Sequence, residues 1–193
     1  MNDESADDKS LMLSFQRTGD GDAFRLLFAR HKESLLAYLQ RLAGRVDVAE
    51  DVSQQAWLKL LEVARKGAYT PSDFASFRTF LFTLARNYYM DKHVRASAAR
   101  VNPLGGEVEN RLPDAAASLD DAAAARQMGA MLDAALRELP YEQRDVVALW
   151  SAGIDIDTIA AMIDAPRDTV ISRKKYALSK LRQSLARQGI EEA

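Results

Sequence analysis

Apolar residues recur at helical spacing along most of the chain, and this periodicity restricts the fold more than any other feature of the sequence. Runs of this kind extend over residues 24–42, 52–63 and 74–99, and helices resume near Asp120. Apolar positions three and four residues apart lie on one face of an α-helix. No alternating strand pattern of useful length occurs, so the sequence predicts an all-α fold.

The same spacing predicts which side chains of the first three helices face inward. These stripes consist of Phe24, Leu27, Phe28, Leu35, Leu36, Leu39 and Leu42; of Val52, Ala56, Leu60 and Val63; and of Phe77, Leu81, Leu84 and Tyr88.

Residues 100–125 interrupt the helical pattern. They contain the turn-forming pairs Asn102-Pro103, Gly105-Gly106 and Pro113-Asp114, followed by an alanine-rich stretch with little to pack against. A connection of roughly 25 residues is unusual inside a compact domain and natural between two. We therefore predict two small helical domains joined by a flexible linker. The predicted segments are an acidic tail at 1–10, a first domain at 11–99, the linker at 100–125, a second domain at 126–188 and a tail at 189–193.

The charge of the chain is segregated although its total is nearly neutral. The 193 residues include 26 Lys+Arg and 28 Asp+Glu, a formal net charge of −2. Residues 78–100 carry five basic side chains against one acid, and residues 166–189 carry seven against one. Two separate basic blocks suggest two surfaces for one polyanion. The alternative is two solvated helix faces.

Several kinds of site are not expected. The absence of cysteine excludes disulfides, thiolate metal sites and cysteine nucleophiles. The only two histidines, His31 and His93, lie in separate predicted helices without metal-ligand spacing, and we expect both to be exposed or to face phosphates. No glycine-rich phosphate loop occurs. We expect no enzyme activity, no metal and no cofactor.

The acidic, polar N-terminus does not resemble a signal peptide or a membrane anchor. No run approaches the roughly 18 apolar residues that a membrane span needs. We therefore expect a cytoplasmic protein without membrane insertion.

Residues 156–175 fit a helix-turn-helix. This motif needs a small residue where its helices cross, a turn residue that tolerates a left-handed backbone, and a β-branched anchor on the second helix. Ala160, Asp164 and Val170 stand at these places. Pro166 then begins the second helix, where its missing N–H costs nothing.

The leading end of the second helix enters the major groove of DNA in such motifs. We expect Arg167, Asp168, Ile171, Ser172 and Lys175 to face outward there, and Arg173, Lys174, Lys180 and Arg182 to meet phosphates. An ordinary helical hairpin with a basic last helix is the alternative.

Two stretches of the first domain suggest binding surfaces. The helix that opens at Asp47 places Glu50 and Gln54 away from its apolar stripe, on a face that could dock a protein, whereas its spacing favours a core position for Trp57. Residues 74–95 mix aromatic and basic side chains, a combination typical of surfaces for single-stranded nucleic acid. Helical spacing nevertheless favours the core for most of these rings.

The two modules together resemble a sigma-70 family sigma factor of the small extracytoplasmic-function (ECF) type. The similarity covers about residues 11–97 and 128–186. In the first domain the similarity rests on Asp22-Ala23-Phe24, Ala49-Glu50-Asp51 with Gln54 and Trp57, and Ala85-Arg86-Asn87. In the second domain it rests on Leu139-Pro140-Tyr141-Glu142-Gln143-Arg144, Ile159-Ala160, and Asp168-Thr169-Val170 with Ser172-Arg173. Asp164 stands where the family usually has Gly, and Ile171 where Lys is frequent.

The resemblance implies a promoter-specificity subunit without catalytic activity. Its implied partners are core RNA polymerase (clamp helices and flap), promoter DNA and an anti-sigma factor. The docking residues implied for core polymerase are Asp47, Glu50, Asp51 and Gln54. Those implied for the −10 element and DNA melting are Tyr69, Phe77, Arg78, Arg86, Asn87 and Lys92. Those implied for the −35 element are Arg167, Asp168, Thr169, Ile171, Ser172, Arg173 and Lys175.

Two other functions remain open from the residues. A stand-alone helix-turn-helix regulator would explain residues 140–186 but not the first domain. A helical adaptor that binds only protein would leave both basic faces merely solvated.

Overall fold

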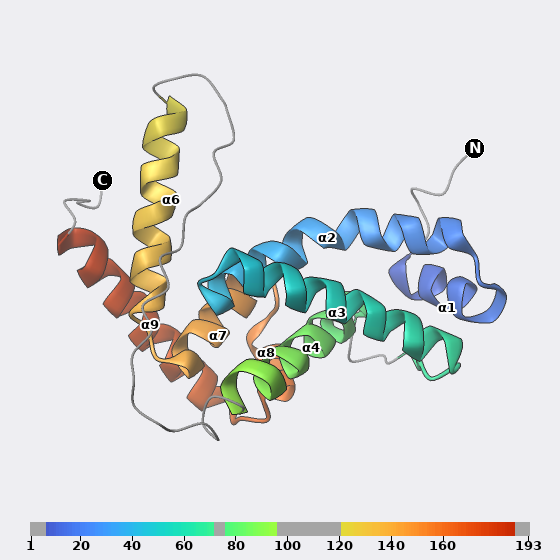
Figure 1. The fold of residues 1–193 in the computed structure, drawn as a ribbon. Coiled ribbons are helices and arrows are strands. Elements are labelled where there is room, and N and C mark those ends of the chain that lie inside the picture. Colours follow the sequence, from blue (N-terminus) through green and yellow to red (C-terminus); the bar gives the residue numbers. More distant parts are fainter. Residues whose placement is uncertain (1–6, 72–75, 96–120, 188–193) are drawn as a thin grey trace. The chain divides into compact units, whose positions relative to one another are not determined.

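The computed structural model describes residues 7–71, 76–95 and 121–187, and the regular secondary structure of these ranges is entirely helical (Figure 1). This confirms the all-α prediction. The elements are α1 (Asp8–Thr18), α2 (Gly21–Ala43), α3 (Val46–Arg65), α4 (Phe77–Tyr89), a π-helix η1 (Met90–Arg95), α6 (Asp121–Arg137), α7 (Tyr141–Ser151), α8 (Ile156–Ile163) and α9 (Arg167–Arg187).

The chain divides into two compact units. The first comprises Met1–Ala37 and Glu50–Gly106, and the second comprises Tyr38–Ala49 and Glu107–Ala193. Most of the predicted linker at 100–125, the first six residues of the tail at 1–10 and all of the tail at 189–193 lie outside the described residues.

Short polar side chains begin the helices of the first unit. The Asp7 carboxylate accepts hydrogen bonds from the backbone N–H groups of Lys9 and Ser10 at 2.8 and 3.2 Å, and so caps α1. Asp20 does the same for α2, because its Oδ1 accepts from the N–H groups of Asp22 and Ala23 at 3.0 and 3.2 Å. These bonds lower the pKa of Asp20, with the bond from Ala23 the largest cause. Such bonds satisfy donors that a helix start otherwise leaves unpaired.

Helices α1 to α4 all contribute side chains to the apolar core of the first unit. Its fully or almost fully buried members include Leu11, Met12, Leu27, Leu35, Val52, Ala56, Leu60, Phe77, Leu81, Phe82 and Ala85. The predicted stripe of α3 is thus confirmed at Val52, Ala56 and Leu60, while Val63 is half-buried.

The inner face of α4 differs from the prediction. Phe77, Leu81, Ala85 and Tyr89 are buried at intervals of four residues, whereas Leu84 and Tyr88 are half-buried. The prediction was therefore right at Phe77 and Leu81 and wrong further along the helix. At 3.6 residues per turn, intervals of three and four residues both stay on one face, and only the packed neighbours decide which of them α4 uses.

The prediction for His31 is also wrong, because its side chain is buried rather than exposed. Its relative exposure is 8%, its Nε2 lies 2.7 Å from Asp8 Oδ2, and its ring lies against Phe77 with centroids 5.2 Å apart. Asp8 lies on α1, so the partner comes from a helix 23 residues earlier in the chain. His93 is half-buried, and its ring stacks on Tyr89.

The second unit has its own apolar cluster. Its buried members are Ala135, Leu136 and Leu139, Val147 of α7, and Ala177 and Leu181 of α9, with the partly buried Leu178 and Leu185 packed against them. This arrangement leaves the opposite, basic side of α9 in contact with solvent.

Candidate protein-docking and nucleic-acid surfaces

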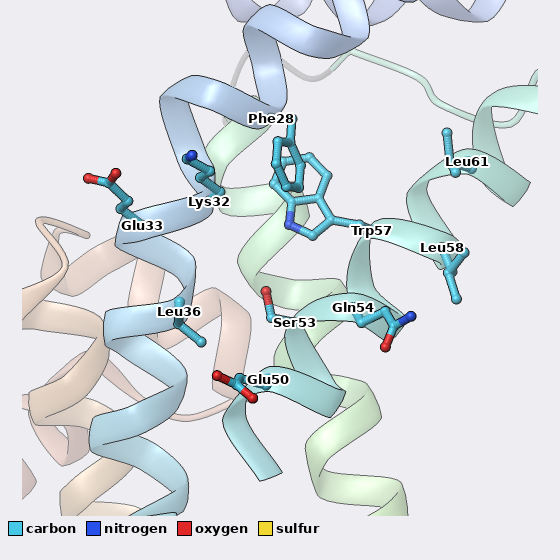
Figure 2. A pocket seen from close by; sticks show the side chains of 10 residues that line it. All are labelled: Phe28, Lys32, Glu33, Leu36, Glu50, Ser53, Gln54, Trp57, Leu58 and Leu61. Carbon is cyan, nitrogen blue, oxygen red and sulfur yellow. The ribbon is translucent and has the colours of Figure 1, made fainter. Parts of the chain in front are cut away.

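The exposed side of α2 and α3 carries an apolar groove of about 520 Å³ (Figure 2). We call it the α2–α3 groove. It is lined by Phe28, Lys32, Glu33, Leu36, Glu50, Ser53, Gln54, Trp57, Leu58 and Leu61. Phe28 and Leu58 keep 40% and 45% of their surface exposed, although both are large apolar residues. Exposed apolar surface of this kind, with polar residues around it, is typical of protein–protein binding sites.

An aromatic cluster forms one wall of the groove. The Trp57 and Phe28 rings lie with centroids 4.9 Å apart, and the Phe24 and Trp57 rings form a T-shaped pair with centroids 5.9 Å apart. Trp57 itself is 6% exposed, which confirms the core position that its spacing favours. Phe28 departs from its predicted inward position, because it covers Trp57 from the solvent side.

The structure separates the four predicted docking residues. Glu50 and Gln54 are exposed at the rim of the groove. Asp47 is in the first turn of α3 and accepts a hydrogen bond from Arg45 Nε at 3.1 Å, which lowers its pKa. Asp51 is turned to a different neighbour, Lys92 of η1.

Lys92 is held by two acceptors. Its ammonium donates to Asp51 Oδ2 at 2.9 Å and to the Tyr88 hydroxyl at 3.0 Å. These bonds raise the pKa of Lys92, with the bond to Tyr88 the largest cause, so the amine stays protonated. A residue predicted to dock polymerase is thus paired with one predicted to contact DNA.

Tyr69 and Phe77 have no free ring face for a nucleic-acid base in this structure. Tyr69 is 4% exposed and packs against Phe80, and its backbone N–H and C=O pair with the Gln16 amide at 2.8 and 3.1 Å. Phe77 is 1% exposed. Base stacking requires an accessible ring, so neither ring could stack on a base in this conformation, and their contact with the −10 element stays a prediction.

The other predicted melting residues of α4 are more accessible. Asn87 is exposed, Arg86 is half-buried, and the half-buried Arg78 lies over the Phe82 ring with its guanidinium carbon 5.3 Å from the centroid. Residues 72–75, which lie between Tyr69 and Phe77 in the chain, are outside the described residues.

The turn of the helix-turn-helix forms as the sequence predicts. Asp164 ends α8 with φ 51° and ψ 55°, in the left-handed region, and its N–H bonds to the Ala160 carbonyl. Asp reaches this region more readily than most residues. The Pro166 carbonyl accepts the N–H groups of Thr169 and Val170 at 2.9 and 3.2 Å, so α9 starts directly after the proline. Val170 is fully buried, as its predicted anchoring role requires.

The predicted outward face of α9 is exposed at its leading end. Arg167, Asp168, Ile171, Ser172 and Lys175 are all exposed, whereas Thr169 and Arg173 are half-buried. Lys174 is engaged within the protein, since its ammonium lies 3.7 Å from the centroid of the Trp150 ring. The phosphate contact expected of Lys174 stays a prediction, and a phosphate would have to share this ammonium with the Trp150 ring.

Three features of the structure were not predicted from the sequence. They are the exposure of Phe28 and Leu58 in the groove, the cation–π pair of Lys174 and Trp150, and a hydrogen bond of 2.9 Å from Arg167 Nε to Asp157 Oδ1. The broad apolar stripe of α2, wider than one core-facing strip, was a signal for the first. The other two join separate helices, which helical periodicity does not reveal.

In the part of the chain that the structure describes, no group of three or more His, Asp or Glu side chains could hold a metal ion. Over the same residues, no helix is long and apolar enough to cross a membrane.

The sequence matches known sigma factors. Residues 27–99 match the family model for sigma-70 region 2. The chain is 30% identical over 183 residues to the RNA polymerase sigma factor CarQ of Myxococcus xanthus, covering 92% of this chain and 97% of CarQ. It is 25% identical over 147 residues to the ECF RNA polymerase sigma factor BldN of Streptomyces coelicolor, covering 76% of this chain and about half (54%) of BldN.

Two solved structures have the same fold. The sigma factor RpoE of Bartonella quintana, solved with the anti-sigma factor NepR, has a TM-score of 0.65 at 23% identity, covering 84% of this chain and 96% of that one. CnrH, solved with the cytosolic domain of CnrY, also has a TM-score of 0.65, at 20% identity over 93% of this chain and 98% of that one.

Proposed function

The chain belongs to the ECF sigma factors of the sigma-70 family, and on this premise we propose that it binds core RNA polymerase, recognises the −35 and −10 promoter elements and promotes DNA melting. We assign it no catalytic step. Its chemistry is differential binding, because strand separation is favoured only if unpaired bases are bound better than the duplex.

The α2–α3 groove is the surface that we propose for docking on core polymerase. An apolar floor with Glu50 and Gln54 at its rim can bury one face of a helix from core polymerase. Neither Glu33 nor Glu50 forms an ion pair with another described residue, so both carboxylates can meet basic groups on that helix. Charge complementarity of this kind accelerates association and orients the partner.

The second unit supports the proposal for the −35 element. In a helix-turn-helix, the second helix enters the major groove with its leading end. In this chain the turn before that helix has its left-handed residue at Asp164, and the leading end of α9 is exposed. For the −10 element we propose contacts by Asn87, Arg86, Arg78 and Lys92, which are more exposed than Tyr69 and Phe77.

An anti-sigma factor is the third partner that we propose. RpoE and CnrH, which share this fold, were each solved with a second protein, NepR and the cytosolic domain of CnrY respectively. A protein inhibitor of this chain that covered the α2–α3 groove would compete directly with polymerase.

Charge reversal at the groove tests polymerase docking. Glu50→Arg should weaken binding of the purified chain to core RNA polymerase at least tenfold, because like charges in an interface cost several kcal/mol. The matched control is Glu62→Arg, which makes the same change of charge on α3 at an exposed residue outside the groove lining. Equal binding by the two variants would place docking elsewhere. Binding of the wild-type chain to DNA but not to core polymerase would favour a stand-alone regulator.

A further inference from the structure

The leading end of α9 is tied to α8 by one hydrogen-bonded ion pair. Arg167, the first residue of α9, donates from Nε to Oδ1 of Asp157, in the first turn of α8, at 2.9 Å. Both side chains are largely exposed, at 59% and 75%. The contact therefore orients the guanidinium without burying it.

This contact leaves the pairing edge of the guanidinium available. A guanidinium has five N–H donors in a planar fork, and only the Nε–H is used by Asp157. The two terminal amino groups are the donors that pair with O6 and N7 of guanine in the major groove. A side chain already held by a carboxylate loses less conformational freedom when it makes those bonds.

Ile171 follows one helical turn after Arg167. Its side chain is 39% exposed although it is apolar, and it lies among the polar Asp168, Ser172 and Lys175. Residues four apart lie on the same side of a helix, about 6 Å apart along its axis. The C5 methyl of thymine is the apolar group that base pairs display in the major groove.

We propose that Arg167 and Ile171 read two base pairs within about two steps of each other, guanine through the guanidinium and thymine through its methyl group. Asp157 is the positioning residue for Arg167. The inference rests on the proposed reading of the −35 element by α9 and adds the bases that this chain selects there.

Selection with the intact holoenzyme provides the starting site. Holoenzyme reconstituted from the full chain and core RNA polymerase is used to select duplexes randomised in the −35 region. In the selected site, each thymine is then replaced singly by uracil, which removes only the methyl group, and each guanine by 7-deazaguanine, which removes the N7 acceptor.

Ile171 is tested by the uracil series. At one thymine, uracil should weaken wild-type binding about fourfold, the effect of leaving one methyl group unburied. Ile171→Ala should lose this difference and bind both duplexes alike. An equal response of wild type and Ile171→Ala at every thymine would overturn the assignment of Ile171.

Arg167 and Asp157 are tested by the guanine series. At one guanine, 7-deazaguanine should weaken wild-type binding about tenfold, and Arg167→Lys should no longer respond, because an ammonium cannot form the two-bond pair. Asp157→Asn should reduce the preference for that guanine over adenine about threefold to tenfold. A preference unchanged by Asp157→Asn would overturn the positioning role.

Glu142→Gln is the charge-matched control for Asp157→Asn. Glu142 is exposed on α7, and removal of its charge should strengthen binding to all sequences alike. If Asp157→Asn does only this, the positioning role is likewise overturned. If a holoenzyme forms but selects no −35 sequence, the proposed function of α9 fails, and this inference fails with it. A holoenzyme that selects a site without guanine or thymine overturns the inference alone.

Discussion

Replacing Asp51 by Asn should increase the affinity of the free chain for single-stranded DNA. Asp51 accepts a hydrogen bond from Lys92 at 2.9 Å, and Lys92 also bonds to Tyr88 at 3.0 Å. While the pair with Asp51 persists, a phosphate must compete with a carboxylate for the same ammonium group. The asparagine side chain cannot compete in this way, because it carries no charge.

The expected gain is small. The two side chains are 48% and 40% exposed, so solvent screens the pair, and a pair of this kind shifts an equilibrium by at most about fivefold. Asp51→Asn should therefore tighten binding about twofold to fivefold. The slope of log affinity against log salt should steepen by up to about 0.7, the value for one additional phosphate contact on a single strand.

Fluorescence anisotropy with a labelled single-stranded oligonucleotide, at several salt concentrations, measures both quantities. Glu50→Gln is the matched control, because it removes the same charge from the adjacent residue of α3, where no ion pair with a described residue is broken. Any general effect of net charge appears in both variants. If the two variants bind equally and have equal slopes, release of Lys92 does not occur, and the ion pair has no part in DNA binding.

Two further predictions concern the helix-turn-helix, and both are measured by urea unfolding of the full chain. Asp164→Val should reduce the free energy of unfolding by about 1–2 kcal/mol, because a β-branched residue at φ 51° is strained. Asp164→Gly should cause no such loss, and equal losses of stability in the two variants would contradict this reasoning. Asp155 caps α8, and bonds from the Thr158 hydroxyl and N–H lower the pKa of its carboxyl below the ordinary value for an aspartate. Its contribution should therefore be present above about pH 4 and be lost as pH falls through the lowered pKa, so the stability difference from Asp155→Ala should shrink on acidification. A difference that stays constant with pH would contradict this.

The local features of this protein follow from short stretches of its sequence. Helix starts and turns depend on residues within one turn of each other. For this reason the left-handed turn at Asp164 and the start of α9 at Pro166 could both be predicted. The buried stripe Val52, Ala56, Leu60 was equally predictable, because helical spacing fixes which residues share a face.

The helix that covers each apolar face is set by contacts between residues far apart in the sequence. The buried His31 ring lies beside Asp8, 23 residues earlier, and the backbone of the buried Tyr69 pairs with Gln16, 53 residues earlier. Lys92 meets Asp51 across 41 residues. Periodicity identifies an apolar face but carries no information about the neighbour that covers it, since that neighbour is selected by the packing of whole helices. The same packing left Phe28 uncovered and so produced the α2–α3 groove.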